Sequence, residues 1–238
     1  MKQAFTLAEV LITIGVIGVV SAMTLPTLVA KYEQAVATTQ LKRIYSIFTN
    51  AEMLSVEDNG DSKNWVYPIS SRDEETGEIT VPITNTEFFN KYYKPYLKTS
   101  DVSDKSRTFD LYKVYNYNGQ DAGFNDNSIG RGNVVRLSDG AWISIWSNNQ
   151  YLVLTVDLNG NKPPNVIGRD VFDFAELYWE GNRKLVIPSI KTISQAMNKD
   201  SYIERCKNFS YVHGGASTCF GIFVNDGWQF TKDYPWKR

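Results

Sequence analysis

The hydrophobic and polar positions divide the chain into an apolar N-terminal stretch and a polar body. Between Phe5 and Ala30 the only ionisable side chain is Glu9, whereas charged residues are frequent from Lys31 onward. About 20 apolar residues in a helix cross the hydrocarbon core of a bilayer, so this stretch is long enough to span a membrane. The pattern predicts a transmembrane helix over residues 5–30.

A second helical pattern follows the apolar stretch directly. Four apolar residues recur at helical spacing, namely Leu41, Ile44, Phe48 and Ala51. This spacing places them on one face of a helix that can pack against a sheet. We therefore expect an amphipathic continuation of the first helix over residues 31–56, with Gly60 as its stop signal.

The remaining residues, 57–238, are expected to form an exported globular head. Thr86 to Lys94 could be a short helix, capped by Thr86 and stopped by Pro95. Four runs have the composition or alternation of strands, at residues 111–117, 134–137, 141–146 and 151–158. Short connections between successive strands favour an antiparallel sheet, so the fold class is α+β.

Charge and composition exclude some classes of function. The net charge is −1 at neutral pH, which gives no electrostatic reason to expect a nucleic-acid partner. His213 is the only histidine, and no serine or cysteine motif accompanies it as a nucleophile. There is no phosphate-binding glycine loop and no paired-cysteine zinc spacing. We therefore do not expect an enzyme.

Glu9 is the most informative residue in the apolar stretch. A carboxylate at the centre of a bilayer costs about 2.5–3.5 kcal/mol on insertion scales, so a simple anchor has no use for it. A cut between Ala4 and Phe5 would create a protonated α-amine one helical turn from Glu9. Pairing with its own amine, or with that of a neighbouring subunit, would offset both desolvation costs and set the register between helices.

The residues before the apolar stretch predict its orientation. Lys2 and the initiator amine precede it, so the N-terminus is expected in the cytoplasm and the head outside, in a single-pass membrane protein. A secretory signal peptide is the alternative, because Val20-Ser21-Ala22 resembles a cleavage site before Met23. That cut would release a secreted enzyme or binding protein. Glu9 inside the apolar region argues against it.

The segment Ala4-Phe5-Thr6-Leu7-Ala8-Glu9, with the long apolar run and Pro26, resembles a known motif. It is similar to the N-terminal methylation motif of type IV prepilins and of type II secretion pseudopilins. The resemblance implies that a prepilin peptidase removes the leader, residues 1–4, and methylates Phe5. It also implies that Glu9 is needed for assembly and that Pro26 bends or locally unwinds the helix. In that family the residue before the cut is usually Gly, where this chain has Ala4.

The resemblance implies a pilin fold and a structural subunit of a pseudopilus or pilus-like filament. The partners implied are the same and other pilin-like subunits, the prepilin peptidase, an inner-membrane assembly platform and membrane lipid. An exported, membrane-anchored binding module is the alternative function.

Cys206 and Cys219 are the only cysteines. If the head is exported, a disulfide between them is the default expectation, with two buried free thiols as the alternative. The region also resembles the C-terminal cysteine loop and closing strand of prepilin-type proteins. That resemblance implies a strand over residues 220–224, followed by a turn at 225–227.

One loop suggests a calcium site, and no cofactor is otherwise expected. The candidate ligands are Asp157, Asn159, Asn161 and Asp170. An EF-hand would require an acidic residue eleven positions after Asp157, where this chain has Gly168, so an EF-hand is excluded. The alternative is that these side chains form Asx-turns in a Gly/Pro-rich loop.

Overall fold

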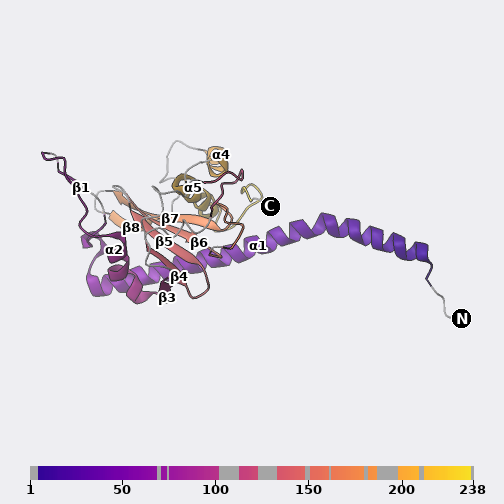
Figure 1. Cartoon of the computed structure of the whole chain (residues 1–238), viewed down its shortest axis with the longest axis horizontal. Helices are drawn as coiled ribbons and strands as arrows, with labels where there is room; N and C mark the ends of the chain where they lie inside the picture. The colour runs from indigo at the N-terminus through magenta and orange to yellow at the C-terminus, as the bar shows by residue number, and fades with distance from the viewer. Residues whose placement is uncertain are drawn as a thin grey trace.

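Helix α1 (Leu7–Asn59) has 53 residues and runs from the N-terminal end of the molecule to the far end of the head (Figure 1). The computed structural model describes residues 5–68, 71–73, 75–101, 113–122, 133–147, 151–160, 162–179, 182–186, 198–208 and 212–236. Thr6 caps the start of α1, and Gly60 caps its end with φ of 78°. The prediction of one continuous helix that stops at Gly60 is confirmed.

The two halves of α1 differ in burial. The head half buries one stripe, made of Ala37, Leu41, Ile44, Phe48, Ala51 and Ser55. The N-terminal half contains an 18-residue window of mean hydropathy 2.0 in which no residue is buried. By length and composition this half could cross a membrane, although a signal sequence would meet the same criterion. Figure 1 shows α1 bending within the half that extends from the head.

The head contains a six-stranded antiparallel sheet in which each strand pairs with the next one along the chain. Its strands are β3 (Thr99–Asp101), β4 (Asn133–Leu137), β5 (Trp142–Ser147), β6 (Tyr151–Asp157), β7 (Val171–Trp179) and β8 (Asn182–Val186). A separate hairpin pairs β1 (Ser71–Arg72) with β2 (Ile79–Thr80). The helical elements are α2 (Asn85–Tyr92), α4 (Lys199–Asn208), α5 (Val212–Asn225) and the short 3₁₀ turns η1 (Ser62–Asn64) and η2 (Lys94–Tyr96).

The buried side chains of α1, α2, the sheet and α5 form one contiguous core. Phe48 of α1 lies against Tyr93, with ring centroids 5.8 Å apart. Tyr45 of α1 lies 5.0 Å from Trp228, which in turn packs on Phe223 of α5. The head half of α1 is therefore part of the head, and the α+β prediction is confirmed.

The predicted hairpin is confirmed. Strands β4 and β5 are joined by the turn at Ser138-Asp139-Gly140, where Gly140 has φ of 96°. The predicted strand at 151–158 is confirmed as β6. The predicted strand at 111–117 is wrong for residues 113–117, the part that the structure describes. Asn116 accepts a hydrogen bond from the Gln120 main chain, and the resulting turn leaves only isolated bridges at Tyr115.

The predicted strand at 220–224 is also wrong, because these residues belong to α5. Phe220 packs against Phe174 of β7 with ring centroids 4.0 Å apart, and Phe223 packs against Phe230 with ring centroids 4.6 Å apart. A short apolar run does not distinguish a buried strand from a buried helix, and tertiary packing decides the outcome here. The predicted turn at 225–227 is present, with Gly227 at φ of 81°.

The short helix was predicted with the wrong cap. Helix α2 begins after Thr84, whose hydroxyl accepts the Glu87 main-chain N–H while the Glu87 carboxylate accepts the Thr84 N–H. This capping box satisfies two N–H groups at the helix start, which Thr86 inside the helix cannot do. The helix ends at Tyr92, and Pro95 lies in η2.

Replacing Thr84 with alanine should lower the free energy of unfolding by about 0.5–2 kcal/mol, the usual cost of losing an N-cap. Thr86→Ala is the matched control, since Thr86 is exposed and caps nothing. Urea unfolding of both variants measures the difference. Equal stability of the two variants would contradict the capping assignment.

Candidate functional site

The N-terminus of α1 brings Glu9 and Thr6 together. The Thr6 main-chain N–H and hydroxyl both donate to Glu9 Oε2 at 2.8 Å, and the Glu9 N–H donates to Thr6 Oγ1 at 3.2 Å. The Glu9 carboxylate is therefore folded back over the first turn, one residue from Phe5. Phe5 itself is exposed, and Ala4 lies outside the described residues.

Sequence reasoning missed the role of Thr6. The signal was present, because a Thr followed three residues later by Glu, just before an apolar run, is the pattern of a capping box. Pro26 lies within α1, which continues through it as a helix. The bend implied by the resemblance is thus compatible with α1, and local unwinding at Pro26 is not observed.

An ion pair joins the head to α1 where the apolar half ends. Arg169 Nη2 lies 2.9 Å from both carboxylate oxygens of Glu33. Nearby, the Gln40 side-chain amide donates to the main-chain oxygen of Leu158 at 3.3 Å. These residues are more than one hundred positions apart, so no local pattern could have predicted the contacts. Together they hold the loop between β6 and β7 against the helix.

Asp170 organises the loop between β6 and β7. Its carboxylate accepts the main-chain N–H groups of Asn165 at 2.8 Å and Val166 at 2.6 Å. Only 5% of Asp170 is exposed. Burial raises the pKa of Asp170 to about 6, and the hydrogen bonds from Val166 and Asn165 oppose that rise.

The structure places three of the four candidate calcium ligands. Asp157 Oδ1 accepts the Asn159 N–H at 3.1 Å, as in an Asx-turn, and the Asn159 side-chain amide donates to Asp170 at 3.3 Å. Asn161 lies outside the described residues. Among the residues that are described, no group of three His, Cys, Asp or Glu side chains could hold a metal ion. The buried side-chain oxygens of Asn159 and Asn165 accept no hydrogen bond within the described part of the chain, so they could contact a cation. Two amide oxygens without a cluster of carboxylates make an incomplete calcium site. The calcium site stays a prediction.

The raised pKa of Asp170 predicts a pH-dependent stability. A carboxyl with a higher pKa in the folded chain stabilises the fold below its unfolded pKa, near 3.8, and this stability is lost as pH rises through about 6. From pH 4 to 7 the wild type should lose on the order of 2–3 kcal/mol more stability than Asp170→Asn. Chemical unfolding of both full-length chains in detergent measures this loss. Parallel pH curves would contradict it.

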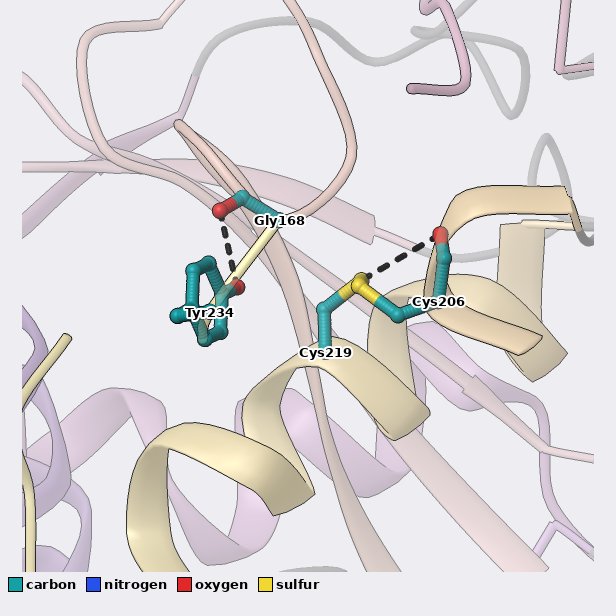
Figure 2. The surroundings of a disulfide bond; sticks show 4 residues. All are labelled: Gly168, Cys206, Cys219 and Tyr234. Carbon is teal, nitrogen blue, oxygen red and sulfur yellow. Dashed lines mark hydrogen bonds between the residues drawn. A yellow bond between two sulfur atoms is a disulfide. The ribbon is translucent and has the colours of Figure 1, made fainter. Parts of the chain in front are cut away.

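The C-terminal tail closes over the same loop (Figure 2). A disulfide joins Cys206 of α4 to Cys219 of α5, so the predicted pairing is confirmed. It links two helices, and the closing strand that the resemblance implied after Cys219 is part of α5. Tyr234 is buried, and its hydroxyl donates to the Gly168 main-chain oxygen at 2.8 Å. Burial holds the pKa of Tyr234 well above its usual value, so this hydroxyl stays a donor.

Comparison with known proteins finds one family. The model of DUF6613, described as a family of unknown function, matches residues 27–238. The matched region begins directly after Pro26 and therefore includes the whole head and the second half of α1. No curated protein and no solved structure matches the chain.

Proposed function

We propose that this chain, which belongs to the DUF6613 family of unknown function, is a pilin-like structural subunit. It would serve a type II secretion pseudopilus or a type IV pilus-like filament. In this proposal a prepilin peptidase cuts between Ala4 and Phe5 and methylates Phe5. The mature subunit then remains in the inner membrane until its α1 helix packs against the α1 helices of other subunits in the filament.

One observation carries the proposal, namely that the apolar half of α1 has no packing partner among the residues that the structure describes. Large side chains along it, such as Leu11, Ile17 and Leu28, are each more than half exposed. Water does not accommodate an apolar surface of this length, so lipid or neighbouring helices must cover it. A membrane followed by a helical filament core provides both in turn.

The position of Glu9 fits an assembly role. Both hydrogen bonds from Thr6 go to Oε2 of Glu9. Among the described residues no donor reaches Oε1, so this oxygen can accept a further hydrogen bond. A cut before Phe5 would place a cationic amine beside this carboxylate. The amine of a neighbouring subunit could take the same place, and the pair would then set the register of two α1 helices.

The continuity of α1 supports the same role. The helix extends unbroken from Glu9 into the core of the head, and the Arg169–Glu33 pair braces the junction. If contacts at the N-terminus fix the axial offset between neighbouring α1 helices, they therefore also fix the relative position of the two heads. The Cys206–Cys219 disulfide supports export, because structural disulfides persist mainly in oxidising compartments.

Mass spectrometry of the mature protein from membranes tests the proposal. An N-terminus at methylated Phe5 is the expected result. A mature chain that begins at Met23 would overturn it and favour a protein released by signal peptidase. An unprocessed chain would favour the membrane-anchored binding module.

A further inference from the structure

The β1–β2 hairpin stands apart from the rest of the head. Its two strands form a sheet of their own, separate from the six-stranded sheet. Figure 1 shows the hairpin extending from the end of the head that lies opposite the N-terminal half of α1. Both residues of β2 are exposed, and 66% of Ile79 is accessible. A lone two-stranded hairpin is at best marginally stable in water, so packing against a further surface would stabilise it.

The hairpin is acidic around its turn. Residues 71–80 contain four acidic residues and one basic residue. Asp73 builds the turn, because its Oδ1 accepts the main-chain N–H groups of Glu75 at 2.9 Å and Thr76 at 2.7 Å. Glu75 and Glu78 are exposed, and neither carboxylate has a hydrogen bond or an ion pair within the described part of the chain. The hairpin therefore presents negative charge to whatever it meets.

A pocket of about 260 Å³ lies beside the head half of α1. We call it the lateral pocket, and it is enclosed by α1, by the segment that leads into β3 and by the turn between β4 and β5. Its walls include the apolar residues Ile47 and Leu137. Both of its charged wall residues, Arg43 and Lys98, are basic. The lateral pocket thus combines an apolar surface with positive charge.

The polar side chains of the lateral pocket can donate hydrogen bonds. Arg43 is held by an ion pair with Asp139, which is not a wall residue. Lys98 is exposed and has no ion pair among the residues that the structure describes. The Asn50 amide and the Ser138 hydroxyl also have no hydrogen-bond partner there, and both groups can donate. An ammonium group with two neutral donors in the same pocket favours a carboxylate.

We propose that the lateral pocket of one copy of this chain receives the acidic hairpin of a second copy. Lys98 then pairs with Glu75 or Glu78 of the second copy. Ile79 covers the apolar wall at Ile47. The contact rests on the proposed function, in which the α1 helices of neighbouring copies lie parallel in a filament. It buries a hairpin that is exposed in the single chain.

The position of the lateral pocket along α1 predicts the offset between the two copies. The pocket lies at the level of Ile47, and between Ile47 and Asn59 the helix rises about 18 Å, at about 1.5 Å per residue. Figure 1 shows the hairpin reaching beyond this end of α1. Parallel copies joined by the hairpin are therefore offset by about 18 Å or more along the helix axis.

Carbodiimide cross-linking of assembled full-length chains tests the contact. This reagent joins a carboxylate directly to a lysine amine, so it links only groups that touch. Filaments are assembled from a mixture of isotope-labelled and unlabelled chains, and mass spectrometry identifies the linked peptides. The expected product joins Glu75 or Glu78 to Lys98, with one labelled and one unlabelled peptide. Absence of this mixed product would overturn the docking.

Charge reversal provides a second measurement. Glu75→Lys combined with Glu78→Lys, and separately Lys98→Glu, should each lower filament incorporation by about three- to tenfold, because attraction between exposed charges becomes repulsion. The chain that carries all three changes should recover most of this loss. Lys232→Glu is the matched control, since it reverses an exposed lysine outside the lateral pocket and should leave incorporation unchanged.

The outcomes separate the docking from the proposed function. Wild-type incorporation of both charge variants, or no recovery in the combined chain, would overturn the docking. The proposed function would stand in that case, because the wild-type chain still enters filaments. A mature wild-type chain that begins at Met23 would overturn the proposed function and the docking with it.

Discussion

Replacing Glu9 with alanine is expected to leave the chain in the membrane and to exclude it from filaments. The alanine variant keeps the apolar length of α1 and removes a costly charge, so insertion does not suffer. In the proposed assembly the variant would lack one member of the ion pair between Glu9 and an α-amine, and breaking a buried ion pair typically costs about 3–5 kcal/mol. We therefore expect filament incorporation to fall at least tenfold, since ~1.4 kcal/mol is already a factor of ten.

Immunoblots of sheared filaments and of the membrane fraction measure this effect. Thr13→Ala is the matched control, because Thr13 lies in the same apolar half and, within the described part of the chain, its hydroxyl bonds only to Val10 of its own helix. Filament incorporation of Glu9→Ala at the wild-type level would contradict the pairing mechanism. A parallel loss in the membrane fraction would point to insertion instead.

The second large effect is expected at Gly168, which lies beneath the C-terminal tail. A Cβ at this position would lie 2.8 Å from Cys219 Sγ and 3.1 Å from Tyr234 Oη. The residue also has φ of 79°, a conformation that costs a non-glycine residue roughly 1–2 kcal/mol. Overpacking a buried site adds about 1–3 kcal/mol. Gly168→Ala should therefore destabilise the head by about 2–5 kcal/mol.

Gly227→Ala separates the two contributions. Gly227 has nearly the same φ, 81°, but an added Cβ there would meet only the flexible end of the Gln229 side chain, at 3.8 Å. This variant should show only the backbone cost, and the difference between the two variants measures the clash with the disulfide. Urea unfolding under oxidising conditions provides both values. Equal losses in the two variants would show that the closeness of Cys219 is unimportant.

Much of the fold could be predicted because its signals are local. The stripe of Leu41, Ile44 and Phe48 repeats at helical spacing and is buried as expected. The β4–β5 hairpin was readable from a glycine-containing turn between two apolar runs. Gly60 marked the end of α1. In each case the physical cause lies within a few residues of the signal.

The C-terminal region shows where local signals fail. Residues 220–224 are apolar and aromatic, and their composition suits a strand. They form part of α5 because rings of β7 and of the tail, such as Phe174 and Phe230, surround a helical arrangement of Phe220 and Phe223. Strands β7 and β8 and helix α4 were likewise not predicted. Their stability depends on neighbours distant in sequence.

The sequence by itself determined that the chain has an apolar N-terminal helix with one carboxylate, joined to a polar head of the α+β class. Hydropathy and helical spacing are properties of neighbouring residues and need no fold to be seen. Only the tertiary structure decided how the head holds this helix, because Glu33 and Arg169 meet across more than one hundred residues. It likewise decided that the tail crosses Gly168 and that Tyr32 and Trp236 enclose one hollow, since long-range packing alone brings those side chains together.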